Sequence, residues 1–365
     1  MKFKLSLLTG IVLSFATTLA IGALPGESIV LDQNTGDYTI TYWDYPNSLK
    51  KRQLRTAIFV PATKINPAVI SAFKLRGKDV VDYSYRLKNG ETSRQSLLTV
   101  FIDPVTDIVS AVPLPKRNED IDINTIAQTD KIGRDSLTTP RGWEGSAVTS
   151  DDGGLRIGWI YTRLDTPDSG LVAGSAQEGF GFSSKDIPGI GEMRFTGHAP
   201  VPMYPAEGPQ GDLRKEFEKV EKNNFVPRNA AVPTIAVPDP FDAATLLGGI
   251  QAETHTWIAK KLLDATFSSQ LDRYFQSAIS AYRLNQPKVG KKEIQTMREL
   301  LKKEHADADR EDDNDDRGEK RDHDGKRDHD EKDKPVLIDK LAARVLDFDL
   351  KYVMKRMGGD KDDRF

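Results

Sequence analysis

A strict alternation of apolar and polar residues runs through Val81-Asp82-Tyr83-Ser84-Tyr85-Arg86-Leu87-Lys88. A period of two places every second side chain on the same side of an extended chain, which is typical of an antiparallel strand with one face on a core. Asn89-Gly90 follows directly, and this dipeptide favours a turn. The segment therefore predicts β-structure.

Similar short segments occur on both sides of this strand. Further strands are predicted at residues 38–42, 56–60, 69–75, 98–102, 155–162 and 193–197. Residues 179–182 are expected to form a strand that enters a turn at Pro188-Gly189. Many short strands separated by turn residues favour an antiparallel sandwich over a parallel sheet. We therefore expect residues 24–200 to form an all-β, immunoglobulin-like sandwich domain.

Prolines become frequent between residues 201 and 240. Proline fixes φ and removes a backbone donor, so this stretch is expected to be a semi-rigid linker. Within it, the charged residues 213–222 are expected to form one exposed helix.

The apolar period becomes helical after the linker. Asp239 is expected as the N-cap of a first helix with Pro240 at its first position. Further helices are expected from Ser269, around residues 294–301, and from Pro335 onward. Their amphipathic faces need partners, so residues 241–357 are predicted to form a small all-α helical bundle. The chain is thus predicted to be multidomain.

Residues 302–334 interrupt this predicted bundle with a highly charged insertion. It contains Lys320-Arg321-Asp322-His323-Asp324 and the near-repeat Lys326-Arg327-Asp328-His329-Asp330. A segment with almost no apolar residue buries no core, so we expect it to be disordered. The alternative is weak binding of calcium or zinc, since carboxylates and imidazoles suit these ions. Its ligands would be Asp316, Asp322, His323, Asp324, Asp328, His329 and Asp330.

The first 23 residues have the layout of a cleavable secretory signal peptide. Lys2 and Lys4 precede an apolar run that ends near Ile21, and small residues follow. The run is short for a membrane span, although an uncleaved anchor is the alternative. We predict a mature chain that begins near Leu24, is secreted, periplasmic or cell-surface, and is not an integral membrane protein.

The composition excludes several chemistries. The sequence has no cysteine, which excludes a thiolate nucleophile, a cysteine-based zinc site and a lipid-anchored cysteine. The 52 basic and 55 acidic residues nearly cancel, so no overall field favours nucleic acid. Neither a Gly-x-Ser-x-Gly elbow nor a phosphate-binding loop occurs. No cofactor is expected.

Aromatic residues in the predicted sandwich are candidates for ligand binding, because their rings can stack on sugars. These candidates are Trp43, Tyr45, Trp143, Trp159 and Tyr161. The competing interpretation is that Trp143 and Trp159 fill the core, as large aromatic side chains usually do.

Parts of the chain are similar to known families. The run Tyr83 to Gly90, then Pro140-Arg141-Gly142-Trp143 and Gly179-Phe180-Gly181-Phe182, resembles a poorly characterised class of exported bacterial β-sandwich proteins. The helices, with Leu341-Ala342-Ala343-Arg344-Val345-Leu346, loosely resemble the FIVAR and FIMAH modules of secreted proteins. The first resemblance implies an exported sandwich fold, and the second implies a non-catalytic accessory module.

These observations favour an exported, non-enzymatic binding or structural protein. Its sandwich would contact a protein or carbohydrate at the cell surface, with the helices as an accessory module. One alternative is a secreted hydrolase of polysaccharide or peptide, because a chain this acidic supplies the paired carboxylates that a glycosidase needs. The other is a surface protein that depends on divalent cations held by the insertion.

Overall fold

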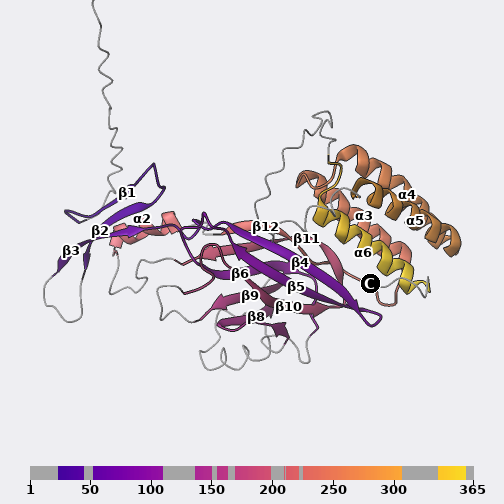
Figure 1. Cartoon of the computed structure of the whole chain (residues 1–365), viewed down its shortest axis with the longest axis horizontal. Helices are drawn as coiled ribbons and strands as arrows, with labels where there is room; N and C mark the ends of the chain where they lie inside the picture. Colours follow the sequence, from indigo (N-terminus) through magenta and orange to yellow (C-terminus); the bar gives the residue numbers. More distant parts are fainter. Residues whose placement is uncertain are drawn as a thin grey trace, which may run out of the picture. The chain divides into compact units, whose positions relative to one another are not determined.

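The computed structural model describes residues 24–44, 52–109, 136–149, 154–162, 169–198, 209, 211–221, 225–305 and 336–358. The chain divides into two compact units. Unit 1 comprises Met1–Lys64 and Gly197–Phe225, and unit 2 comprises Ile65–Thr196 and Val226–Phe365. Figure 1 shows three antiparallel sheets and the helices that accompany them.

Unit 1 contains a three-stranded antiparallel sheet and one helix. Its strands are β1 (Ser28–Leu31), β2 (Tyr38–Asp44) and β3 (Gln53–Phe59), in the order β1-β2-β3. The helix is α2 (Gly211–Glu221). The strands expected at 38–42 and 56–60 are confirmed as β2 and β3, although β3 begins and ends earlier than expected.

Helix α2 is not simply exposed, as the charge of its sequence suggested. Leu213 and Phe217, four residues apart, lie on one side of the helix and are fully buried. The ring of Phe217 packs edge-on against Phe59 at 4.8 Å, in a core that also contains Ile40 and Tyr42. Charged residues cover the rest of the helix, so its composition predicted an exposed helix although one side of it is apolar.

Unit 2 contains two sheets. The four-stranded sheet has the order β4-β5-β10-β7, and the five-stranded sheet has the order β12-β11-β6-β9-β8. The strands are β4 (Pro67–Arg76), β5 (Val80–Asn89), β6 (Leu97–Val105), β7 (Leu137–Thr138), β8 (Trp143–Thr149), β9 (Leu155–Tyr161), β10 (Ala176–Ser184), β11 (Ile187–Gly197) and β12 (Val226–Ile235). The strand quoted first in the sequence analysis is confirmed as β5, with Tyr83 and Tyr85 buried.

The two sheets of unit 2 contact each other through aromatic side chains. Trp159 lies edge-on to Tyr85 and to Phe180, and the hydroxyl of Tyr85 donates to the carbonyl of Ala231 at 2.9 Å. At one border β12 lies beside β4, because the amide of Ala231 donates to Ser71 Oγ at 3.1 Å. These contacts join the sheets across the core and along this border, which we call the β4/β12 seam.

The region expected to be a proline-rich linker contains a strand. Residues 226–235 form β12, which pairs with β11 from Ile187↔Ile235 to Phe195↔Val226. Its prolines, Pro227 and Pro233, are tolerated because β12 is the outermost strand of its sheet, where not every amide needs a partner. The turn expected at Pro188-Gly189 is likewise corrected, since both residues lie inside β11 and the turn falls at Lys185-Asp186.

Four helices follow β12. They are α3 (Ala243–Ala259), α4 (Ala265–Arg283), α5 (Pro287–His305) and α6 (Lys340–Arg356). Asp242, Asp264 and Asp339 cap α3, α4 and α6 by accepting backbone amides. The first N-cap is therefore Asp242 and not Asp239, α4 begins before Ser269, and α6 begins after Pro335. Among the described helices, none is both long and apolar enough to span a membrane.

The helices share a core with the sheets. Helices α3 and α6 contact β12, α4 packs on α3, and α5 packs on α4 and α6, so the four helices lie side by side in Figure 1. Helix α6 also packs on the β4/β12 seam. The ring of Phe348 meets Phe73 of β4 edge-on at 5.1 Å, and Arg344 donates to the carbonyl of Ser71 at 3.2 Å. The β-rich part and the helices are thus both present, but they belong to one compact unit with one hydrophobic cluster.

Two predicted features lie outside the described residues. They are the signal peptide at residues 1–23 and the charged insertion from residue 306 onward. The first residues assigned to that insertion, 302–305, belong to the end of α5.

We expect the substitution Phe217→Ala to unfold unit 1 selectively. Removing a fully buried phenylalanine costs about 3–5 kcal/mol, and the hydrophobic cluster described in unit 1 consists of five buried side chains. Hydrogen exchange should show lost amide protection in β2 and β3 with unchanged protection in β5. The matched variant Phe180→Ala in unit 2 should show the reverse, and loss in both units from either variant would contradict the division.

Candidate binding surface

Among the described residues, α2 covers one face of the sheet in unit 1 and no element covers the other. The register places Ile40, Tyr42 and Phe59 on the covered face. Successive side chains of a strand alternate between faces, so their neighbours lie on the opposite side. We define the open face as Ser28, Val30, Thr39, Thr41, Trp43, Leu54, Thr56 and Ile58.

The open face is apolar and uncharged. Val30, Leu54 and Ile58 are 37%, 47% and 65% exposed, and none of the eight side chains carries a charge. Thr41 and Thr56 face each other across β2 and β3, with their hydroxyl oxygens 3.1 Å apart. In a chain with 29% charged residues, an uncharged surface of this kind is a distinct feature.

Trp43, a candidate from the sequence, lies at one end of the open face. Its indole N–H donates to the carbonyl of Pro25 at 3.0 Å, and its backbone amide lies 3.4 Å from Glu27 Oε1. Gly26 lies against the side chain of Leu54. Trp43 therefore anchors the segment that precedes β1 and borders the face while remaining half-buried.

The other aromatic candidates do not join Trp43. Trp143 and Trp159 are buried between the two sheets of unit 2, where their indole N–H groups donate to Gln177 and to the carbonyl of Thr138. Tyr161 packs edge-on against Trp143 and is half-buried, and Tyr45 lies outside the described residues. The rings of Trp143 and Trp159 are enclosed by protein and offer no face for a sugar. The core interpretation of these two residues is the one that the burial supports.

The candidate metal ligands of the charged insertion all lie outside the described residues. Within the described ranges, no group of three or more histidine, cysteine, aspartate or glutamate side chains is placed to hold a metal ion.

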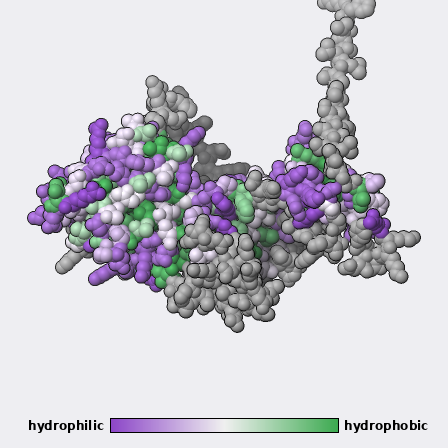
Figure 2. Space-filling model, turned by 180° about the vertical axis from the view of Figure 1, so that it is seen from behind, coloured by the Kyte–Doolittle hydropathy of each residue, from purple (hydrophilic) through white to green (hydrophobic). Residues whose placement is uncertain are grey.

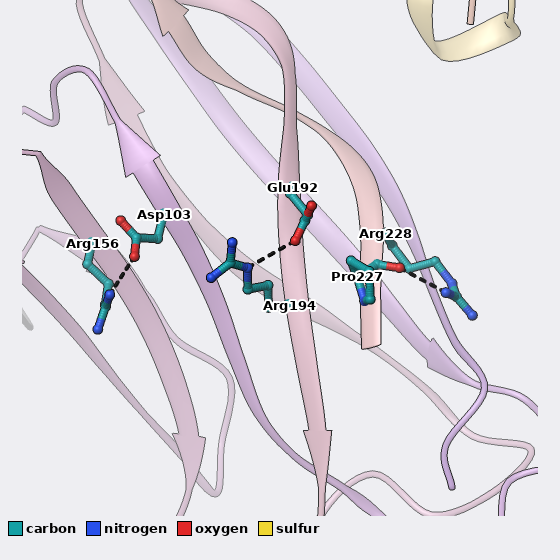
Figure 3. A network of polar contacts seen from close by, with 6 residues as sticks. All are labelled: Asp103, Arg156, Glu192, Arg194, Pro227 and Arg228. Atoms are coloured by element: carbon teal, nitrogen blue, oxygen red, sulfur yellow. Dashed lines mark hydrogen bonds and ion pairs between the residues drawn. The ribbon is translucent and has the colours of Figure 1, made fainter. Parts of the chain in front are cut away.

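Exposed apolar residues also occur in unit 2, where Ile258 and Val336 line one hollow and others lie on separate elements. Ile70, Ile160 and Leu284 lie on β4, on β9 and after α4, far apart in the sequence and on different elements. Figure 2 shows hydrophobic residues in separate patches among hydrophilic ones. The charged side chains on the five-stranded sheet pair locally, as Arg156 does with Asp103 at 2.9 Å and Arg194 with Glu192 at 2.9 Å (Figure 3).

An open hollow of ≈ 380 Å³ lies where α3 ends and where α4 and α6 begin. A bridge between Leu263 and Ile338 brings these segments together. Asp264 and Asp339 line the hollow, but their carboxylates accept the first amides of α4 and α6. Helix capping therefore accounts for both acidic groups.

A second polar feature lies on the buried side of α6. Asp349 is fully buried, and within the described part of the chain neither of its carboxyl oxygens has a hydrogen-bond partner. Burial raises the pKa of Asp349 well above its usual range, and the nearby charge of Glu253 raises that pKa further. Burial also raises the pKa of Tyr83, whose hydroxyl donates to the carbonyl of Asp186 at 3.0 Å. These groups are enclosed at the helix–sheet interface, so we interpret them as structural.

No protein-family model, no curated protein and no solved structure matches this chain.

The sequence analysis missed Val30, Leu54 and Ile58. The sequence does contain a pattern that indicates this face. The uncharged residues Leu54, Thr56 and Ile58 alternate with Arg55 and Ala57, so they share one side of a strand. A strand with apolar residues on both faces is usually interpreted as buried on both faces, so the pattern alone does not indicate an exposed face. Only the placement of α2 shows which face is covered.

We expect Asp349 to make unit 2 less stable as the pH rises. A pKa raised by folding means that the native state binds the proton more tightly, so stability is greatest below the unfolded pKa of about 4 and falls toward the native pKa. The Asp349→Asn variant lacks this titration. Urea unfolding between pH 4 and pH 8 should show the native chain losing up to about 1.4 kcal/mol per pH unit relative to the variant.

The variant Asp347→Asn is the matched control, two positions away on α6. Burial raises the pKa of Asp347, but the hydrogen bonds and charges of Arg298 and Lys351 outweigh burial and lower that pKa. Its contribution to stability is therefore present above the unfolded pKa and lost as the pH falls. Below about pH 5, comparison with Asp347→Asn should show a difference in pH slope of opposite sign. Identical slopes for the native chain and Asp349→Asn between pH 4 and pH 8 would contradict the assignment.

Proposed function

We propose that this chain is an exported, non-enzymatic binding protein whose open face contacts a neutral partner at the cell surface. The observation that carries the proposal is the uncharged open face of unit 1, where Val30, Leu54 and Ile58 are exposed together. Exposed apolar patches of this kind are typical of interaction sites, because they lose unfavourable water contact on binding.

The chemistry of the open face fits a carbohydrate. A neutral glycan presents apolar C–H surfaces beside hydroxyl groups, and the face offers apolar side chains beside the hydroxyls of Ser28, Thr39, Thr41 and Thr56. Threonine hydroxyls both donate and accept hydrogen bonds, which matches sugar hydroxyls. A protein partner with an uncharged surface is the second ligand class that this face accommodates.

Unit 2 serves as the scaffold in this proposal. We infer that its two sheets form an immunoglobulin-like sandwich and that the four helices, which share its hydrophobic cluster, have an accessory, non-catalytic role. The aromatic contacts of Trp159 with Tyr85 and Phe180 support the sandwich, because two sheets packed face to face share such a core. The signal-peptide layout of residues 1–23 supports export.

The variant Thr39→Lys tests the proposed binding surface. Thr39 lies in the middle of the open face, between Val30 and Ile58 in the register, so a lysine there places a charge among neutral groups. We expect at least tenfold weaker retention on insoluble neutral polysaccharides and on a glycan array, with an unchanged melting temperature, since lysine can extend to solvent.

The control variant is Ser84→Lys, which lies on the middle strand β5 of unit 2 and is exposed. It should bind as the native protein does. Equal binding by all three proteins would remove the open face as the site. Robust turnover of polysaccharide, ester or peptide substrates in parallel assays would overturn the non-enzymatic role.

A further inference from the structure

Strand β3 has a free edge. In the order β1-β2-β3, it is one of two outer strands, and among the described residues only β2 pairs with it. It spans seven residues, whereas the other outer strand, β1, spans four. Its free edge is therefore the longer row of backbone donors and acceptors available in unit 1.

In unit 2, by contrast, the outer strands of the sheets lie beside other strands. There β4 lies beside β12, where Arg228 Nε donates to the carbonyl of Pro67 at 2.6 Å. At the other border β7 lies close to β8, since Gly145 of β8 approaches Leu137 and Thr139. The outer strands of unit 2 thus have neighbours within the unit.

The usual protections of an edge strand are absent from β3. Proteins block exposed edges with prolines, bulges or charged side chains. Residues 53–59 contain no proline, and they pair with β2 at every position from Gln53↔Asp44 to Phe59↔Tyr38 without a bulge. The single charge, on Arg55, is paired with Asp44 at 2.6 Å.

We propose that β3 pairs antiparallel with β3 of a second copy of this chain, about a two-fold axis at Thr56. In this register Leu54 of one copy lies opposite Ile58 of the other, so the two exposed apolar side chains of β3 meet twice. Arg55 lies opposite Ala57, so no like charges face each other. A surface that complements itself in this way is what a two-fold interface requires.

The charge of β3 disfavours the register with its axis at Arg55. An axis at Arg55 would place the two arginines directly opposite each other, which is destabilising across strands. With the axis at Thr56, the two sheets form one continuous sheet of six strands. The two open faces then lie on the same side, which presents the proposed binding surface twice.

The absence of cysteine allows a direct test with single-cysteine variants. Opposite residues of antiparallel strands have Cα atoms about 4.5–5.5 Å apart, within the range that a disulfide spans. Purified Thr56→Cys in a thiol–disulfide buffer should therefore form a covalent dimer. Thr41→Cys, on the same face but on the middle strand, should not, because its symmetry mate is about 14 Å away.

A mixture of two variants tests the register. Leu54→Cys alone and Ile58→Cys alone should give little covalent dimer, since each residue lies about 14 Å from its own mate. Mixed together, they should cross-link, and the dimer should contain one copy of each. The native chain should show concentration-dependent dimerisation in sedimentation, and Ile58→Lys should weaken it at least tenfold, whereas Ile160→Lys on unit 2 should not.

The proposal is overturned if the native chain stays monomeric to about 100 µM, where a specific interface of even modest affinity associates. It is also overturned if Thr56→Cys cross-links no faster than Thr41→Cys. Neither result depends on whether the open face binds a glycan, so failure of the dimer and failure of the proposed function are distinguishable.

Discussion

The docking of α6 on the β4/β12 seam is the contact on which the architecture of unit 2 depends. At this seam the sheets are joined through side chains, such as Ser71 Oγ of β4, which accepts the amide of Ala231, and the ring of Phe73 on β4 needs a cover. Phe348 supplies it by packing on Phe73, and Arg344 donates to the carbonyl of Ser71. The same helix carries Asp349, a buried carboxyl without a described hydrogen-bond partner. Burial of such a group is costly, so the surrounding apolar packing must outweigh it.

This constraint separates the roles of the two units. In unit 2 the sheets, the seam and the helices bury one another in a single hydrophobic cluster. In unit 1 one helix covers one face of a three-stranded sheet, which leaves the other face and the edge of β3 without a described partner. The surplus of apolar surface in unit 1 is therefore the basis of both the proposed binding site and the proposed self-association.

The sequence predicted the features that depend on local periodicity. The alternation through Tyr83 and Tyr85 identified β5 and the antiparallel class of the sheets, and the helical spacing identified the four C-terminal helices. It could not predict long-range contacts. The prolines of residues 226–235 led to the prediction of a linker instead of β12, because a sequence does not reveal that a strand will be outermost in its sheet. Trp43 and Trp159 were both candidates for ligand binding, and the core interpretation offered for Trp159 is the one that its burial supports, whereas Trp43 borders an open face.

The central structural claim is that the helices are an integral part of unit 2 and not a separate bundle. Hydrogen exchange on the variant Phe348→Ala tests it directly, because this substitution removes a contact between α6 and β4 at a cost of about 3–5 kcal/mol. The account predicts that amide protection falls together in α3, α6, β4 and β12, while β2 and β3 of unit 1 are unaffected. Loss of protection confined to the helices, with β4 and β12 unchanged, would contradict it.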